Sequence, residues 1–254
     1  NHYDFILTKN APSYLLGAYL KRKGLNWVAS WNDPFPSGFY PYPYGNGKDW
    51  VGTRKDHKVI KQMRKASFHV FPTYLLQEHM RTFLQIPEDR CKVIPHVVLK
   101  EKNTMNSLQR KADLMNDTLS IIHSGNLYGH RNPLTFFSAV NNVLVANPSY
   151  KISVTILGKM DDKFKHELGK MSKLKKCLTF LPPVEYQKSL SLLEDYDVAC
   201  VIEAPCRKGE AVFLPTKVTD FMQMGIPVLA ISPNDGVLHQ LYRNGNIGYY
   251  GEVS

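Results

Sequence analysis

The chain of 254 residues is poor in features that mark several specialised classes of protein. It has only four cysteines, and no two of them have the CxxC spacing of a zinc or redox motif. No apolar run approaches the roughly 20 residues that span a bilayer, and the amino-terminal residues lack the pattern of a signal peptide. We therefore expect a cytoplasmic protein with reduced thiols and no metal site. The abrupt entry into an apolar strand also suggests that Asn1 is not the natural start.

Two common nucleotide-binding motifs are also missing. The chain contains neither the GxGxxG of dinucleotide-binding folds nor the GK[ST] of a P-loop, which argues against NAD binding and ATP hydrolysis. Its composition, with 43% hydrophobic and 21% charged residues, is that of an ordinary globular protein.

Positive charge is concentrated in the first half of the chain. Residues 1–111 hold 18 Lys and Arg against 8 Asp and Glu, whereas residues 112–254 hold 14 of each, so the first half carries the whole net charge of +10. This asymmetry favours an acidic partner such as an anionic membrane surface, a phosphate-bearing substrate or nucleic acid. A solvated basic face without a partner is the alternative.

The stretch 214–230 predicts a loop, a helix and a strand. Pro215 is tolerated where a helix begins, and Gly225 ends the helix because glycine accepts the left-handed conformation. Lys217 and Asp220 lie three residues apart, so both belong to the first turn, near the positive end of the helix dipole. A cation, free N–H groups and a carboxylate suit a ligand with phosphates and hydroxyls, such as a nucleotide sugar. An ordinary crossover helix with a surface lysine and aspartate is the alternative.

This stretch resembles the donor-binding segment of the GT-B glycosyltransferases of the group 1, or family 4-like, kind, whose members often read PxK…(E/D)…xxGxPV. The resemblance implies that Asp220 holds the donor ribose, that Lys217 faces the diphosphate and that Thr216 belongs to the same donor site. In this family the residue after an earlier strand contacts the nucleotide base through its backbone, and that residue corresponds to Val184.

A second segment, residues 119–133, predicts a strand, a glycine-containing loop and the start of a helix. Glycine at such a turn lets backbone amides approach phosphate. The segment resembles the GRLxxxK loop of the same family, with Gly125 at the glycine, Asn126 at the arginine and Arg131 at the lysine. The resemblance implies that these three residues belong to the donor site. With the first cation missing, binding of the diphosphate would be weaker than in the family unless Lys217 compensates.

Two polar residues are expected near the cleft of the first domain. Asp33 follows the predicted strand 27–30, and open α/β sheets bind ligands just beyond the carboxyl ends of their strands. The surrounding residues resemble the RDPW feature of the family, with Asn32 in place of the arginine. His96, in a segment that resembles the family's viPNG, would also lie near the cleft. We predict Asp33 as catalytic, whereas a structural role is the more common one for a lone histidine such as His96.

A second catalytic carboxylate is expected ahead of the donor-binding helix. Many retaining members of the family have two acidic residues eight apart, but counting back eight from Asp220 leads to Val212. Glu210 is the nearest substitute, and we predict it as catalytic, while Glu203 is a weaker candidate. The spacing therefore leaves open whether the anomeric configuration is retained or inverted.

The order of the predicted elements gives two α/β domains. Residues 1–116 form an acceptor-side domain that ends in a linker at about 100–116, and residues 117–254 form a nucleotide-sugar-binding domain with five predicted strands. In the first domain, residues 48–65 predict a basic helix, and residues 36–47 predict an aromatic loop that either binds the acceptor or packs back on the domain. The resemblance implies the GT-B fold, in which two Rossmann-like domains with parallel sheets face each other across a cleft. The amino-terminal domain is expected to be incomplete.

The resemblance implies transfer of a sugar from a UDP- or GDP-linked donor to a glycan or lipid-linked acceptor, in surface polysaccharide or glycoconjugate biosynthesis. Arg131, Lys217 and helix amides would stabilise the leaving group, so no metal or other cofactor is expected. The basic half would contact an anionic membrane surface, which predicts a peripheral protein on the inner membrane face, and no nucleic acid is expected as a partner. A nucleotide-sugar 2-epimerase and a non-catalytic protein that binds a nucleotide or a partner are the alternatives.

Overall fold

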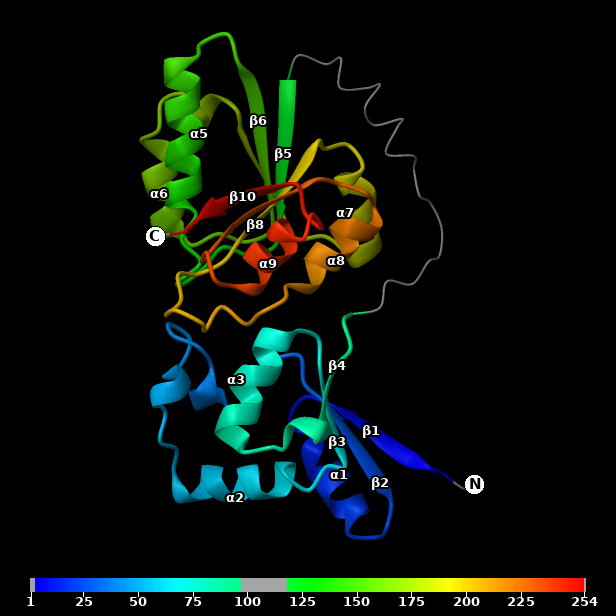
Figure 1. Ribbon diagram of the computed structural model, residues 1–254. Coiled ribbons are helices and arrows are strands. Elements are labelled where there is room, and N and C mark those ends of the chain that lie inside the picture. Colours follow the sequence, from blue (N-terminus) through cyan, green and yellow to red (C-terminus); the bar gives the residue numbers. More distant parts are fainter. Residues whose placement is uncertain (1–2, 97–117, 254) are drawn as a thin grey trace. The chain divides into compact units, whose positions relative to one another are not determined.

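The structure is a computed structural model that describes residues 3–96 and 118–253 (Figure 1). These residues form two compact units. Unit 1 contains the amino-terminal part of the chain together with Cys206–Leu214 and Asp235–Val237, and unit 2 contains the rest. The predicted linker at about 100–116 lies outside the described residues, and the exact division of the chain into two domains stays a prediction.

Unit 1 is built on a parallel sheet of four strands in the order β1-β2-β3-β4. Its main elements are β1 (Phe5–Lys9), α1 (Tyr14–Lys21), β2 (Asn26–Ser30), α2 (Arg54–Met63), β3 (Phe68–Phe71), α3 (Tyr74–Leu84) and β4 (Cys91–Val93). Because the strands are parallel and follow one another along the chain, a helix crosses over between each neighbouring pair.

The core of unit 1 lies on one face of its sheet. Trp27 of β2 and Phe71 of β3 belong to this core. Side chains of all three α-helices also belong to it, among them Met63 of α2 and Leu76 and Met80 of α3. On the opposite face the strand register places Leu7, Val28 and Phe68 side by side. Leu7 is 62% and Phe68 44% exposed, so this apolar face is not covered by the described residues.

The helix predicted over residues 48–65 is wrong in its first part, because α2 begins only at Arg54. The Thr53 side chain accepts a hydrogen bond from the Asp56 amide, and the Asp56 carboxylate accepts one from the Thr53 amide at 2.7 Å. This capping box fixes the start of the helix. Gly52, with φ of +74°, keeps the preceding residues out of the helical conformation.

Unit 2 is built on a parallel sheet of six strands in the order β10-β9-β8-β5-β6-β7. Its elements are β5 (Thr118–Ser124), α5 (Leu134–Ala146), β6 (Lys151–Leu157), α6 (Asp162–Gly169), β7 (Leu178–Leu181), α7 (Tyr186–Leu193), β8 (Val198–Ile202), α8 (Thr216–Gln223), β9 (Val228–Ser232), α9 (Val237–Arg243) and β10 (Tyr249–Glu252). Counted along the chain, the order is 3-2-1-4-5-6, which is that of a doubly wound dinucleotide-binding sheet.

The strand β10 was missed in the prediction of five strands for this domain. It is four residues long and contains a glycine, so its sequence carries little strand signal. It forms because it pairs in parallel with β9, from Tyr249 opposite Leu229 to Glu252 opposite Ser232.

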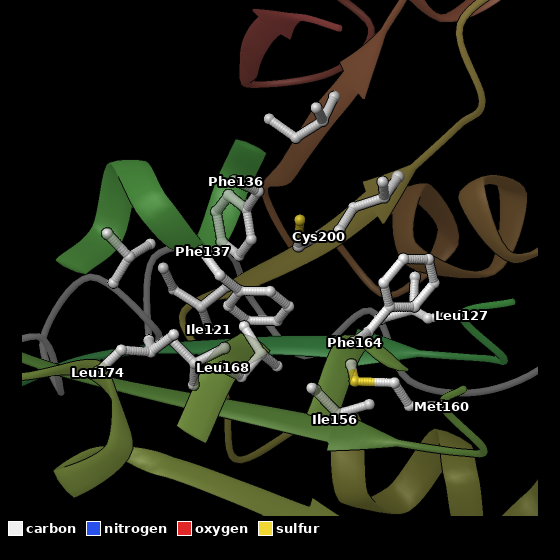
Figure 2. Close-up of a cluster of buried hydrophobic side chains, with 14 of the residues drawn as sticks. Ile121, Leu127, Phe136, Phe137, Ile156, Met160, Phe164, Leu168, Leu174 and Cys200 are labelled. Atoms are coloured by element: carbon white, nitrogen blue, oxygen red, sulfur yellow. The ribbon is translucent and has the colours of Figure 1, made fainter. Parts of the chain in front are cut away.

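Helices cover both faces of the unit 2 sheet. On one face, Ile121 and Ile156 pack against Phe137 of α5 and Leu168 of α6 (Figure 2). On the other face, the next residue of β5, Ile122, belongs to a second buried cluster that includes side chains of α8 and α9. Alternate residues of β5 therefore point to opposite faces, as expected for a central strand buried on both sides.

The predicted α/β fold class with parallel sheets is confirmed in both units. Among the residues that the structure describes, no helix has both the length and the apolar character needed to cross a bilayer.

Candidate functional site

The candidate site lies where β5 and β8 run side by side in the middle of the unit 2 sheet. The chain leaves β5 towards α5 on one face and leaves β8 towards α8 on the other, so the two loops diverge at the carboxyl ends of these strands. Doubly wound sheets bind their ligands in the crevice at this position. The loop after β5 begins at Gly125, and Glu203 directly follows β8.

The helix α8 places the two predicted donor-binding side chains near this crevice. It begins at Thr216 with Pro215 as its N-cap, and Gly225 follows it with φ of +67°, so the predicted start and end are confirmed. Val218 and Phe221 are buried against the sheet. Lys217 and Asp220 therefore lie on the remaining surface of the first two turns, where both are partly buried.

The amino group of Lys217 occupies the space beside the backbone of Gly125. A Cβ atom placed on Gly125 would lie 2.1 Å from Lys217 Nζ, and the φ of Gly125 is +138°. Gly158 lies similarly close to the backbone of Gly125, because a Cβ atom on Gly158 would lie 2.3 Å from the carbonyl oxygen of Gly125. Any side chain at residue 125 would therefore displace the ammonium group, so the glycine brings Lys217 to the carboxyl edge of β5.

Arg131 and Glu203 complete a charged cluster around Lys217. Arg131 Nη2 lies 3.7 Å from Glu203 Oε1, and Glu203 is only 8% exposed. Burial raises the pKa of Glu203, while Arg131 and Lys217 lower it. Burial lowers the pKa of Lys217 to about 8, Arg131 acts in the same direction and Glu203 opposes both. Two cations and one carboxylate leave a net positive charge, which suits an anion.

His123 was missed by the sequence analysis, although it precedes the Ser124–Gly125 turn by one residue. Its Nδ1 atom lies 3.0 Å from the carbonyl oxygen of Cys200, and a carbonyl only accepts, so Nδ1 carries the proton. The buried Nε2 atom is then an acceptor, and it has no hydrogen-bond partner among the described residues. Burial, and next Lys217, lower the pKa of His123 to about 3, so the imidazole is uncharged at neutral pH.

Asp220 accepts a hydrogen bond of 2.8 Å from the hydroxyl of Tyr186. This bond, together with burial and the charge of Asp220, raises the pKa of Tyr186. Tyr186 is the first residue of α7 and follows Val184 by two residues, so the loop after β7 reaches the first turns of α8. The structure thus brings Tyr186, two residues after the predicted base contact Val184, against Asp220, the predicted ribose ligand.

Two other predicted donor-site residues have backbone contacts. The side-chain oxygen of Asn126 accepts a hydrogen bond of 2.9 Å from the amide of Lys159, which ties the loop after β5 to the loop after β6. The carbonyl of Thr216 accepts a bond from the Thr219 hydroxyl within α8. Asn126 therefore contributes a contact between loops rather than a cation.

In unit 1, Asp33 and His96 come together beyond the carboxyl ends of β2 and β4. Burial raises the pKa of Asp33, and His96 lowers it. Burial and Lys9 lower the pKa of His96, and Asp33 raises it. Burial and, to a smaller degree, Asp33 raise the pKa of Tyr40. A carboxylate and an imidazole that influence each other's protonation have the chemistry of an acid–base pair, and the sequence analysis considered the two residues separately.

Glu210 belongs to Cys206–Leu214, a later segment of the chain that is part of unit 1. It is 3% exposed, and its Oε2 atom accepts a hydrogen bond of 3.1 Å from the amide of Tyr42. A Cβ atom on Gly47 would lie 2.3 Å from Glu210 Oε1. Arg207 forms an ion pair with Asp49 nearby. Glu210 thus anchors the aromatic loop through backbone contacts.

The aromatic loop itself packs back on unit 1. Phe39 is fully buried and stacks on Phe83 with ring centroids 3.9 Å apart. Tyr40 and Tyr44 contact Phe213, with centroids 5.8 and 5.9 Å apart. Tyr42 is 49% exposed. Over residues 3–96 and 118–253, no group of three or more His, Cys, Asp and Glu side chains is arranged to hold a metal ion.

No protein-family model matches the chain, and no curated protein does. Solved structures share its fold. The N-terminal domain of Candida albicans trehalose-6-phosphate phosphatase aligns with a TM-score of 0.65 at 12% identity, over 97% of this chain and 58% of that one. Anabaena HepE, in complex with UDP and glucose, aligns with a TM-score of 0.63 at 15% identity, over 98% of this chain and 64% of that one.

A third structure, described as trehalose-6-phosphate from E. coli bound with UDP-2-fluoro glucose, aligns with a TM-score of 0.63 at 12% identity, over 98% of this chain and 63% of that one. At these identities the similarity establishes the fold, which is that of GT-B glycosyltransferases. The chain spans about three fifths of the length of these structures.

Proposed function

We propose that the protein is a family 4-like glycosyltransferase that transfers a sugar from a nucleotide-diphosphate donor to a glycan or lipid-linked acceptor. The observation that carries this proposal is the position of the Lys217 ammonium, held over Gly125 and near Arg131 at the carboxyl edge of β5. The fold supports it, since two proteins of the same fold were solved with UDP and glucose and with UDP-2-fluoro glucose.

In this proposal the donor lies across the carboxyl ends of β5, β7 and β8. Lys217 and Arg131 contact the diphosphate, together with backbone amides at Gly125 and at Thr216 in the first turn of α8. Asp220 binds the ribose hydroxyls through the carboxylate that Tyr186 orients. Backbone groups near Val184 contact the base, and Asn126 shapes the phosphate loop through its bond to Lys159.

The chemistry proposed is electrostatic stabilisation of the departing diphosphate. Lys217 and Arg131 are fixed before the reaction, so the negative charge that develops on the leaving group meets cations that need no reorganisation. No cofactor or metal is part of the proposal. Asp33, whose protonation is coupled to that of His96, is proposed as an acid–base group for the acceptor hydroxyl. Glu210 is retained as the second proposed catalytic carboxylate.

The basic amino-terminal half is proposed to attract an anionic acceptor or membrane surface. Its excess of ten positive charges would raise the local concentration of a lipid-linked phosphate acceptor. A role in surface polysaccharide or glycoconjugate synthesis, at the inner face of the membrane, follows from this part of the proposal.

Thermal melting with UDP, GDP, TDP and CMP, without metal, tests the donor site. A nucleotide at a hundred times its dissociation constant adds about 2.7 kcal/mol to the free energy of unfolding. We expect a shift with one nucleotide that disappears in Lys217→Ala and Asp220→Ala but persists in Lys175→Ala, which removes an exposed lysine elsewhere in unit 2. The absence of a shift with every nucleotide contradicts the donor site.

A non-catalytic nucleotide-binding protein is the second candidate function. It is favoured by Asn126, which supplies no cation, and by Glu210, whose carboxylate is bonded to the amide of Tyr42. The two functions differ in turnover. Release of labelled sugar from the donor that shifts the melting temperature supports the enzyme, whereas binding without any release or transfer supports the second candidate.

A further inference from the structure

Glu203 has no place in the donor contacts proposed above, although it is the most buried charged side chain of the cluster. It directly follows β8, and its amide donates a hydrogen bond of 2.9 Å to the carbonyl of Ile231 on β9, which fixes its backbone in the sheet. Its side chain is 8% exposed and its Oε1 atom lies 3.7 Å from Arg131 Nη2. A carboxylate beside an anion-binding site repels the ligand, so its presence requires another reason.

The reason suggested by the geometry is the mutual repulsion of the two cations. Arg131 lowers the pKa of Lys217 in addition to the effect of burial, and Glu203 acts in the opposite direction. The other titratable groups that influence Lys217 carry no charge at neutral pH. His123 has a pKa of about 3, and burial raises the pKa of the Cys200 thiol well above its ordinary value. Among the described residues that influence Lys217, Glu203 is therefore the anion that helps Lys217 to keep its proton beside Arg131.

Burial strengthens the effect of Glu203 on the two cations. An unpaired charge in a poorly solvated environment is costly, and a buried ion pair persists only when each charge has a partner. Arg131 comes from the loop after β5, Lys217 from α8 and Glu203 from the end of β8, so three separate elements contribute to one cluster. The fixed backbone of Glu203 provides the point to which the side chains of the other two elements are attracted.

We propose that Glu203 is a positioning residue that holds the Arg131 guanidinium beside the Lys217 ammonium, so that a pyrophosphate group meets both cations already in place. This proposal rests on the proposed function for its ligand, but the arrangement of the three side chains can be tested without any ligand.

The proposal and a simple charge effect predict opposite results for Glu203→Gln. If Glu203 were only a nearby negative charge, its removal would strengthen the binding of pyrophosphate. If Glu203 positions the cations, its removal weakens binding, most strongly at pH 8.5, where Lys217 without its counter-ion has lost its proton. Because the same ligand is compared across variants, its own titration cancels in the ratio of affinities.

The first experiment measures Lys217 alone. The pH dependence of its acylation by a small amine-reactive reagent, read by mass spectrometry, gives its pKa in the full chain. We expect Glu203→Gln to lower this pKa and Glu194→Gln, which removes an exposed carboxylate of unit 2, to leave it unchanged. Equal values in the two variants overturn the proposal.

The second experiment measures the affinity for inorganic pyrophosphate by calorimetry at pH 6.5 and pH 8.5. We expect Glu203→Gln to weaken binding about tenfold at pH 8.5, or about 1.4 kcal/mol, and less at pH 6.5. Tighter binding at both pH values overturns the proposal. If the unsubstituted protein binds no pyrophosphate while the pKa of Lys217 still falls in Glu203→Gln, the arrangement of the cluster stands and the donor-binding function fails.

A shorter carboxylate tests the proposal should Glu203→Gln not fold. Glu203→Asp keeps the charge but withdraws it by one methylene from Arg131. We expect weaker pyrophosphate binding with a pKa of Lys217 near that of the unsubstituted protein. Unchanged affinity for pyrophosphate in Glu203→Asp contradicts a positioning role.

Discussion

Glu203 and Glu210 lie seven residues apart on one segment of the chain, and both are almost completely buried, at 8% and 3% exposure. They belong to different units and have different partners. Glu203 faces Arg131 and lies within the field of Lys217, whereas Glu210 accepts a hydrogen bond from the Tyr42 amide and lies against Gly47.

The difference shows that the role of a buried carboxylate depends on what neutralises it. Glu210 accepts a hydrogen bond from the Tyr42 amide, so this contact stabilises a loop. Glu203 lies near two side-chain cations, and in the proposed function these cations also bind an anion. Substitutions around the two residues should therefore affect different properties, in unit 2 mainly ligand affinity and in unit 1 mainly stability.

The largest effect is expected for Gly125→Ala. The new methyl group would occupy the space of the Lys217 amino group, at a backbone φ of +138°. We expect UDP affinity to fall about a hundredfold, or about 2.7 kcal/mol, with a loss of stability of about 1–3 kcal/mol from backbone strain. Gly129→Ala is the matched control, since its φ is +60° but a Cβ atom there meets nothing within 4 Å. Equal losses of UDP affinity in both variants would show that strain alone is responsible.

The second-largest effect, a loss of stability, is expected for Glu210→Ala in unit 1. The substitution leaves the amide of Tyr42 without this acceptor, which costs about 1–3 kcal/mol of stability. Urea unfolding followed by tryptophan fluorescence measures it selectively, because all three tryptophans of the chain, Trp27, Trp31 and Trp50, lie in unit 1. Glu210→Gln retains an acceptor and should lose less. A larger shift of the tryptophan transition in Glu203→Gln than in Glu210→Ala contradicts the distinction between the two residues.

The next prediction concerns pH: UDP affinity is expected to fall about tenfold per pH unit above the pKa of Lys217. Its pKa is lowered from 10.5 to about 8, so the ammonium is lost above pH 8 and UDP affinity should fall there. The contribution of Lys217 to the free energy of unfolding changes with pH in the opposite direction. Between pH 8 and 10.5 the unfolded state binds the extra proton, so the free energy of unfolding that Lys217 contributes rises with pH in this window.

Calorimetric titration with UDP between pH 6.5 and 9.5 measures the loss of affinity. Lys217→Arg keeps its charge across this range and should remove most of the pH dependence. An identical decline of UDP affinity in Lys217→Arg and in the unsubstituted protein would assign the titration to another group.

The smallest effect is expected for Tyr186→Phe. The substitution removes the hydroxyl that donates to Asp220 at the surface, so stability should change by less than about 0.5 kcal/mol. UDP affinity should fall about threefold, because the Asp220 carboxylate loses its orientation, at a cost of about 0.65 kcal/mol. Tyr150→Phe, in the residue before β6, controls for the loss of an exposed hydroxyl. Unchanged or tighter UDP binding in Tyr186→Phe contradicts this role.

Local chemistry in the sequence determined much of what is observed in unit 2. Pro215 and Gly225 fixed the ends of α8, since one has no N–H to donate and the other accepts positive φ. Apolar runs determined the central strands, because a parallel sheet covered on both faces needs them. The start of α2 was misjudged, because a capping box at Thr53 and a glycine at residue 52 outweigh the helical pattern of the preceding residues.

Only the tertiary structure decided which charged residues meet. Arg131, Glu203 and Lys217 are separated by many residues, and they come together because β5 and β8 are neighbours at the point where the strand order reverses. The sequence indicated Lys217 and Arg131 through local motifs. It did not indicate that Nε2 of His123 lacks a hydrogen-bond partner among the described residues, or that Glu203 lies beside Arg131. Such roles depend on burial and on distances between elements, which local sequence patterns do not contain.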